Sequence, residues 1–68
     1  MKNSIRERRQ ELSLTQQELA RLVGVSRQTI NAIETGKFDP SLSLAFRLST
    51  VFKEPVELLF QPTEANPS

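Results

Sequence analysis

Hydrophobic and polar residues recur along most of this chain with the period of α-helices. After Thr15, the residues Leu19, Leu22 and Val23 recur at intervals of three and four, which puts them on one face of a helix. Comparable patterns elsewhere predict five helices and no strands, over residues 3–13, 15–24, 26–36, 41–52 and 56–60. The fold class expected from the pattern is therefore all-α.

The start of the second helix carries the clearest local signal. Thr15 and Glu18 have the spacing of a capping box, in which each side chain accepts a hydrogen bond from the backbone of the other residue. Leu14 before the cap and Leu19 at the fourth helical position form a hydrophobic staple. Gly24 is expected to end this helix, because glycine enters the left-handed cap conformation without steric cost.

A third helix follows after a tight turn. Ser26 is expected to cap it, and Val25 with Ile30 repeats the staple. By the same reasoning, Asn3 caps the first helix and Ser41 caps the fourth.

The segment 41–52 is the most apolar of the five. Its hydrophobic residues cover more than one stripe, which predicts a central helix packed against several neighbours: Leu42, Leu44, Ala45, Phe46, Leu48, Val51 and Phe52. Ile5 and Leu12 are expected to share one face of the first helix. Leu59 and Phe60 are expected to cover the core as a lid.

The chain is expected to form one domain over residues 1–60, with two capped helices and their turn over residues 16–35. Residues 61–68 are polar, contain two prolines and have no apolar anchor beyond Ala65. We therefore expect a disordered tail there.

Composition excludes several classes of function. The 68 residues include no cysteine and no histidine, which excludes disulfides, thiolate zinc sites, cysteine nucleophiles and the commonest general base. Asp39 and Glu54 have no further ligand at a metal-binding spacing, so no metal site and no cofactor is predicted, and the chain is not expected to be an enzyme. No apolar run approaches the roughly 20 residues that span a bilayer. We expect a cytoplasmic binding module with no membrane partner.

Charge is distributed unevenly. Residues 1–10 carry four basic side chains against one acidic side chain, whereas residues 38–68 carry two basic against four acidic ones. If the basic end forms one surface, that surface attracts phosphate. Arg6 and Arg8 are equally consistent with phosphate contacts and with solvated helix charges.

The third helix presents a polar face opposite Ile30 and Ile33. An advance of about 100° per residue puts these residues outward: Arg27 at the leading edge, then Gln28, Asn31, Ala32 and Thr35. Arginine bonds guanine O6 and N7 as a pair, and glutamine or asparagine bonds adenine N6 and N7. This face is suited to reading base edges.

Residues 14–37, LTQQELARLVGVSRQTINAIETGK, resemble the helix-turn-helix of the Cro and phage-repressor family, also called the xenobiotic-response-element family. The defining positions of that motif are occupied by Gln16, Ala20, Gly24, Val25, Ile30 and Ile33. The resemblance extends from Asn3 to about Phe60. It implies a compact five-helix DNA-binding domain that regulates transcription, with the expected role of a repressor on a pseudo-palindromic operator, and association with the nucleoid when bound to DNA.

The resemblance also implies residue roles. The base-reading positions correspond to Arg27, Gln28, Asn31 and Ala32. The phosphate positions correspond to Gln16, Thr29, Lys37 and Phe38, with backbone amides contributing after the third helix. Gln16 could instead only begin its helix, Thr29 could act in the cap, and a packing role is favoured for Phe38.

Further implications concern the fold and the partner. Family members commonly pair an arginine at the position of Arg9 with a glutamate at the position of Glu34, and a structural ion pair is favoured here over a phosphate contact. A homodimer is expected, with Val56, Leu59 and Phe60 as its contact residues. Two positions depart from the family: Lys53, where glycine is frequent, and Pro55, where serine or threonine is frequent. Lys53 is therefore expected in a left-handed conformation.

Two alternative functions stay open at this point. An antitoxin would repress its own operon and mask a toxin, but residues 61–68 offer a short segment with almost no apolar anchor for such a partner. A protein-interaction module without DNA binding would carry acidic or apolar residues on the recognition face, where this chain has Arg27, Gln28 and Asn31.

Overall fold

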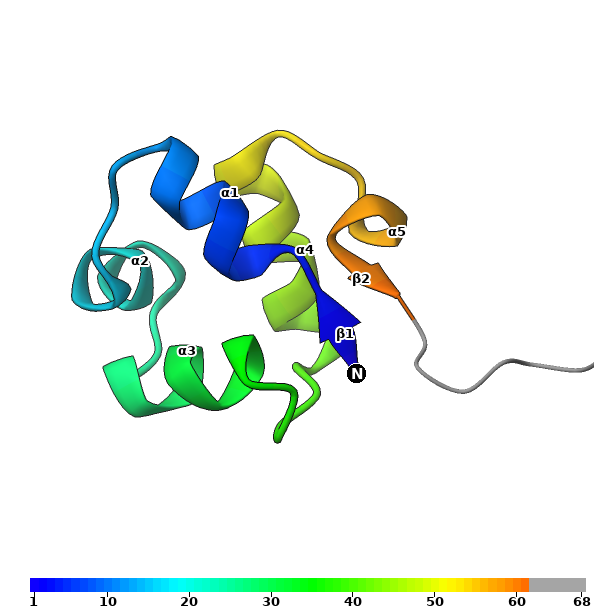
Figure 1. Cartoon of the computed structure of the whole chain (residues 1–68), viewed down its shortest axis with the longest axis horizontal. Helices are drawn as coiled ribbons and strands as arrows, with labels where there is room; N and C mark the ends of the chain where they lie inside the picture. The colour runs from blue at the N-terminus through cyan, green and yellow to red at the C-terminus, as the bar shows by residue number, and fades with distance from the viewer. Residues whose placement is uncertain (62–68) are drawn as a thin grey trace, which may run out of the picture.

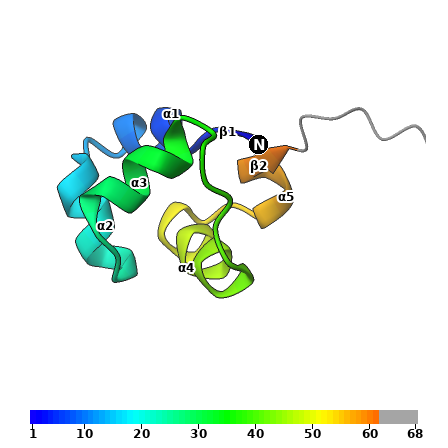
Figure 2. The same cartoon turned by 90° about the horizontal axis from the view of Figure 1, so that it is seen from below.

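Five helices and one pair of two-residue strands make up the part of the chain that the computed structural model describes, residues 1–61. In chain order these are β1 (Lys2–Asn3), α1 (Ile5–Glu11), α2 (Gln16–Val23), α3 (Arg27–Glu34), α4 (Leu42–Phe52), α5 (Val56–Leu59) and β2 (Phe60–Gln61) (Figure 1). The all-α fold class is confirmed. In Figure 2, α1 and α3 lie on one side of the molecule and α4 on the other, with α2 and α5 at opposite ends.

The predicted helix ends at α2 are confirmed. The Thr15 hydroxyl accepts a hydrogen bond from the Glu18 amide at 3.0 Å, and the Glu18 carboxylate accepts one from the Thr15 amide at 2.8 Å. Gly24 ends the helix with φ 76° and ψ 34°, in the left-handed region. The capping box and the glycine thus fix both ends of the helix that precedes the turn.

Serine caps begin the next two long helices as predicted. The Ser26 hydroxyl accepts from the Thr29 amide, and the Ser41 hydroxyl accepts from the Leu44 amide, each at 3.1 Å. At α1 the arrangement is different: Ser4 occupies the cap position, while the Asn3 side-chain oxygen accepts from the Ile5 amide at 3.1 Å. The first helix is therefore shorter than predicted at both ends.

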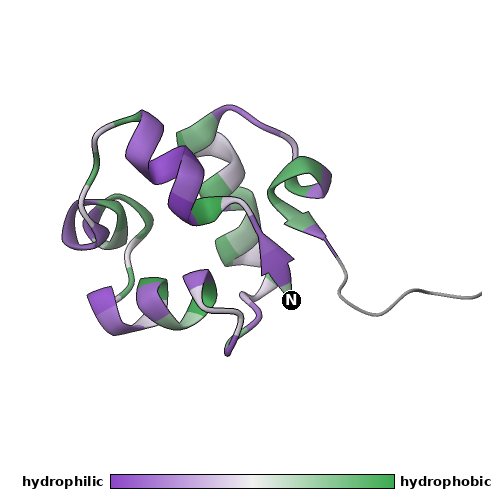
Figure 3. Ribbon diagram, viewed as in Figure 1, coloured by the Kyte–Doolittle hydropathy of each residue, from purple (hydrophilic) through white to green (hydrophobic). Residues whose placement is uncertain are grey.

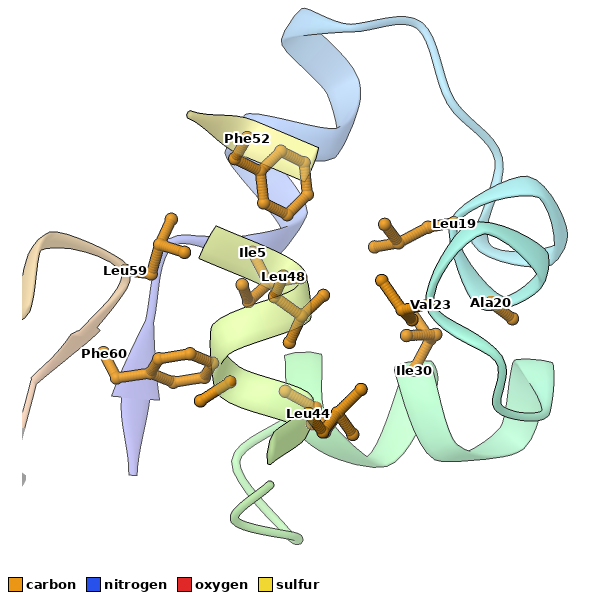
Figure 4. Packing of buried hydrophobic residues seen from close by; sticks show 12 residues of the cluster. Ile5, Leu19, Ala20, Val23, Ile30, Leu44, Leu48, Phe52, Leu59 and Phe60 are labelled. Carbon is orange, nitrogen blue, oxygen red and sulfur yellow. The ribbon is translucent and has the colours of Figure 1, made fainter. Parts of the chain in front are cut away.

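The hydrophobic core lies between the five helices (Figure 4). Each helix and β2 contribute to a cluster of buried apolar side chains: Ile5, Leu19, Ala20, Val23, Ile30, Ile33, Leu44, Ala45, Leu48, Phe52, Leu59 and Phe60. Within residues 1–61 no helix is long and apolar enough to cross a membrane.

Four apolar side chains that the pattern put on apolar helix faces are exposed, and for these residues the prediction was wrong: Leu22 on α2, 59% exposed, and Leu12, Leu42 and Phe46. Leu12 is 51% exposed because α1 ends at Glu11 and Leu12 is already its C-cap residue. Leu42 and Phe46 are 67% and 57% exposed, one turn apart on α4. Figure 3 shows the hydrophobic character of this helix, but its stripe is broader than the face that its neighbours cover.

A small antiparallel pairing was missed by the sequence pattern. Lys2 pairs with Gln61 and Asn3 with Phe60. Two residues are too few to show the alternation of a strand. Gln61 therefore belongs to the folded domain and not to the predicted tail; residues 62–68 lie outside the described residues.

Lys53 ends α4 in the left-handed conformation predicted for it, with φ 56° and ψ 40°. A side chain in this region costs about 1–2 kcal/mol, which glycine avoids, although glycine also loses about 0.5–1 kcal/mol more through chain entropy. Lys53→Gly is therefore expected to raise the free energy of unfolding by about 0.5 kcal/mol in urea denaturation. Lys37→Gly is the control, because Lys37 is exposed and has no positive φ; it should not stabilise. A less stable Lys53→Gly variant would contradict the prediction.

The capping box predicts an acid-sensitive contribution to stability. Hydrogen bonds from the Thr15 backbone and then from its side chain lower the pKa of Glu18, and Arg21 lowers it slightly further. A carboxyl group whose pKa is lower in the folded state stabilises the fold above its unfolded-state pKa, about 4.3, and this contribution disappears as pH falls through the folded-state value. Glu18→Gln should lower Tm at neutral pH, and the difference from the wild type should narrow in acid. A Tm difference independent of pH would refute this linkage.

Candidate nucleic-acid interface

Helix α3 is built as a two-sided element at the edge of the molecule. Ile30 and Ile33 are 0% exposed and anchor it to the core, to which the neighbouring helix α2 contributes Ala20, 1% exposed. On its other side, Arg27, Gln28 and Asn31 are exposed and Ala32 is partly buried. Figure 2 shows α3 in front of α1, with no other helix covering its outer side.

The beginning of α3 holds the predicted phosphate residue Thr29. Its hydroxyl lies 3.0 Å from the Ser26 hydroxyl, and its amide donates to the same oxygen at 3.1 Å. Thr29 is partly buried. It is thus part of the cap that fixes where the exposed Arg27 and Gln28 begin.

Beyond the end of α3, the chain turns at Gly36, which has φ 78°. The amides of Lys37 and Phe38 both donate to the Ala32 carbonyl oxygen, at 2.9 and 3.2 Å. These two amides, considered above as phosphate donors, are therefore engaged within the chain. The Lys37 side chain itself is exposed, and Phe38 beside it is 48% exposed.

Arg9 of α1 and Glu34, the last residue of α3, lie in direct contact. Arg9 Nε donates to Glu34 Oε2 at 2.7 Å and Arg9 Nη2 donates to Glu34 Oε1 at 3.3 Å. Arg9 Nη1 also donates to the Leu14 carbonyl at 2.8 Å. The side chains are 12% and 3% exposed, so this ion pair joins α1, the segment before α2 and α3 in a largely dry environment.

Gln16 has an intramolecular partner that its position in the sequence did not indicate. Its Nε2 donates to Glu34 Oε1 at 3.0 Å, and the residue is partly buried. The first residue of α2 and the last residue of α3 are thus tied together. No local sequence signal joins residues that lie 18 positions apart.

Two further residues hold the helix-turn-helix and were missed. Arg47 Nη1 donates to the Val23 carbonyl at 2.9 Å and lies against the Gly24 turn, where an added Cβ would meet it at 3.3 Å. Asn3 Nδ2 donates to the Ile33 carbonyl at 2.8 Å. Both side chains donate to carbonyl groups near the carboxyl end of a helix, where the regular helical hydrogen bonds stop; the Ile33 carbonyl also accepts from the Gly36 amide at 3.0 Å.

The two other basic side chains considered for phosphate contacts, Arg8 and Arg6, differ in their surroundings. Arg8 lies 3.2 Å from Glu11 and 3.9 Å from Glu54, whereas Arg6 is exposed. Within residues 1–61, no three His, Cys, Asp or Glu side chains gather where they could hold a metal ion.

The proposed contact residues of a dimer need correction. Leu59 is 0% and Phe60 is 8% exposed, because both side chains pack into the core of their own chain. Val56 is partly buried against the same core. Leu58, which is 54% exposed, is the large apolar side chain that α5 presents outward.

Comparison with known proteins agrees with this geometry. The family model described as "Helix-turn-helix" matches residues 5–59. The chain is 52% identical over 60 residues to an uncharacterized HTH-type transcriptional regulator of Methanocaldococcus jannaschii, covering 88% of this chain and 91% of the relative. A regulator of Methanothermobacter thermautotrophicus, described in the same words, is 52% identical over 61 residues, covering 88% of each chain. The HTH-type regulator YgzD of Bacillus subtilis is 41% identical over 66 residues, covering 97% of this chain and all of the relative (100%).

Proposed function

This chain belongs to the Cro/C1-type helix-turn-helix family, and from that membership we propose that it represses transcription by binding a pseudo-palindromic DNA operator as a homodimer. The observation that carries the proposal is the outward face of α3. There Arg27, Gln28 and Asn31 are exposed on a helix whose opposite side is locked into the core by Ile30 and Ile33. Rigid placement of hydrogen-bonding side chains on an uncovered helix suits insertion into the major groove.

The mechanism is equilibrium occupancy of a DNA site. Arg27 bonds a guanine edge and Gln28 an adenine edge, with Asn31 and Ala32 meeting the bases one turn later. The sugar-phosphate backbone is contacted by residues that border this face: Lys37, Thr29, Phe38 and Gln16. Phosphate neutralisation supplies affinity for any duplex, and the base contacts supply the preference for one sequence.

A dimer follows from the size of the recognition surface. One such domain contacts few base pairs, and two copies related by a two-fold axis would insert their recognition helices about 34 Å apart, in successive major grooves. Helix α5 lies at one end of the molecule and α3 along one edge (Figure 1). A two-fold axis beside α5 would keep both copies of α3 on the same side of the dimer, which supports Leu58 as a contact residue.

Leu58→Glu is therefore expected to dissociate the dimer and weaken operator binding together. Burial of a leucine side chain contributes about 1.5–3 kcal/mol, so the dimer dissociation constant should rise about tenfold or more, measured by analytical ultracentrifugation. Leu22→Glu is the matched control, because Leu22 is 59% exposed on α2, at the other end of the molecule. If the two substitutions change the dimer dissociation constant equally, α5 is not part of the dimer interface.

The proposed function is tested by selecting bound sequences from a random duplex pool. We expect enrichment of a site with two-fold symmetry, and reduced transcription from a reporter promoter that carries this site. Absence of enrichment over random DNA at low salt would overturn the proposal. Enrichment of a single half-site bound by a monomer would overturn only its dimeric part.

A further inference from the structure

Glu34, at the end of α3, accepts hydrogen bonds from two different helices, α1 and α2. One oxygen, Oε2, accepts from Arg9 Nε at 2.7 Å. The other, Oε1, accepts from Arg9 Nη2 at 3.3 Å and from Gln16 Nε2 at 3.0 Å. With the Glu34 side chain only 3% exposed, its carboxylate is held in one place, and the Gln16 side chain is attached to it.

This contact determines which way the Gln16 amide points. A glutamine amide has an oxygen that only accepts and a nitrogen that only donates, and the two can exchange places by rotation of the group. Rotation would set the amide oxygen against the Glu34 carboxylate with no proton between two acceptors. The carboxylate therefore selects the orientation in which one Nε2 proton is used, and among residues 1–61 the other Nε2 proton has no further hydrogen-bond partner.

We propose that Glu34 is a positioning residue for DNA binding, which orients Gln16 so that its amide offers an N–H donor to a DNA phosphate. This inference rests on the proposed function. A phosphate oxygen accepts hydrogen bonds and would be repelled by a misoriented amide oxygen, so the selected orientation is the one that binds. Glu34 thus sets the direction of the Gln16 hydrogen bond without touching the nucleic acid.

Arg9 makes this arrangement compatible with a polyanion. A carboxylate near a phosphate would normally raise the free energy of binding through like-charge repulsion. The Arg9 guanidinium bonds both Glu34 oxygens and offsets that charge. The Arg9–Glu34 pair therefore has no net charge toward the DNA, while the Glu34 carboxylate still accepts the hydrogen bond from Gln16.

The experiment uses the full chain and a duplex enriched from the random pool, with one phosphate at a time replaced by an uncharged methylphosphonate. In the wild type, replacement at one phosphate in each half-site should lower affinity about tenfold, as expected for a hydrogen bond to a charged group. Gln16→Ala should lower the affinity for the unmodified duplex. In this variant the methylphosphonate at the sensitive phosphate should lower affinity by less than about twofold, while replacements at the other phosphates should have the same effects as in the wild type. Gln17→Ala, an exposed neighbour of the same type, should keep the full wild-type pattern.

Glu34→Gln should also lose most of the sensitivity at that one phosphate, because the amide orientation is no longer selected. A purely structural role would instead weaken all DNA contacts alike and leave the phosphate pattern unchanged. If circular dichroism shows that Glu34→Gln is unfolded, the double variant Arg9→Met/Glu34→Leu replaces it in the test. This variant removes both charges together, a change that commonly preserves stability.

The outcomes separate the two levels of the proposal. If the wild-type protein enriches no duplex, the proposed function fails, and this inference fails with it. If the wild type binds a duplex and the Glu34 variants retain full sensitivity at the Gln16-dependent phosphate, Glu34 does not position Gln16. If Gln16→Ala keeps the wild-type methylphosphonate pattern, Gln16 does not contact phosphate at all.

Discussion

Replacing Glu34 with alanine is expected to lower the free energy of unfolding by about 3 kcal/mol. The substitution leaves the Arg9 guanidinium, 12% exposed, without its charged partner, and removes the acceptor of Gln16 as well. Breaking a buried ion pair from one side is costly because the remaining charge has lost its hydration and gained nothing in return. Arg9→Ala should have an effect of similar size, since it strands the Glu34 carboxylate and frees the Leu14 carbonyl.

A double-mutant cycle measured by urea denaturation distinguishes this pair from two independent charges. The Arg9→Ala/Glu34→Ala variant should be far more stable than the sum of the single effects implies, because neither charge is then left alone. Arg8→Ala with Glu11→Ala is the matched control: those side chains are 3.2 Å apart but 33% and 63% exposed. Exposed pairs contribute about 0–1 kcal/mol. The coupling would be refuted if each single substitution lowered the free energy of unfolding by less than about 0.5 kcal/mol and the two effects added up in the double variant.

The sequence predicted the parts of this fold that depend on neighbouring residues. Thr15, Gly24, Ser26 and Ser41 each act on a backbone group three to five positions away, so their chemistry is visible in a short window. The left-handed Lys53 was instead predicted from the resemblance to the family, in which glycine is frequent at this position. Both ends of α2 and the starts of α3 and α4 are thus set by local chemistry, unlike the ends of α1.

The errors concern packing between distant segments. The period of Leu42 and Phe46 is that of a buried helix face, but whether a neighbour covers that face is decided by the arrangement of the other helices. For the same reason Leu59 and Phe60 were expected both to cover the core and to contact a second copy; the structure confirms the first role, and their burial leaves almost no surface for the second. Hydrophobic spacing predicts which residues share a face and not what lies against it.

The candidate site shows the same division. Exposure of Arg27, Gln28 and Asn31 follows from the helical period once Ile30 and Ile33 are buried. The supports behind the site join residues far apart in the chain. Arg47 reaches Val23 over 24 positions and Asn3 reaches Ile33 over 30. Polar side chains of this kind have many possible partners in a sequence, and only the packed structure selects one.

Base reading and phosphate binding should separate in mutants of the α3 face. Gln28→Ala is expected to lower affinity for the preferred operator by about 1–3 kcal/mol and to relax the requirement at one base pair, with adenine the expected base. Arg27→Ala should lower affinity by a similar amount and relax the requirement at a guanine. Because Arg27 stands at the leading edge of the helix, part of the affinity loss should be the same for all DNA sequences. Both side chains are exposed, and neither takes part in the cap formed by Ser26 and Thr29. Their loss should therefore leave the fold intact, which thermal denaturation checks.

Lys37→Ala provides the contrast, because Lys37 lies beyond Gly36 and is proposed to reach only the phosphate edge of the groove. Its loss should weaken operator and scrambled duplexes by nearly the same factor and reduce the salt dependence by about one phosphate per domain. The Lys37 amide keeps its hydrogen bond to the Ala32 carbonyl in this variant, so the turn is preserved. The measurement is the affinity of each variant for both duplexes across a salt series. If Gln28→Ala weakens both duplexes equally, Gln28 binds DNA without reading it, and the recognition face must be assigned to other residues of α3.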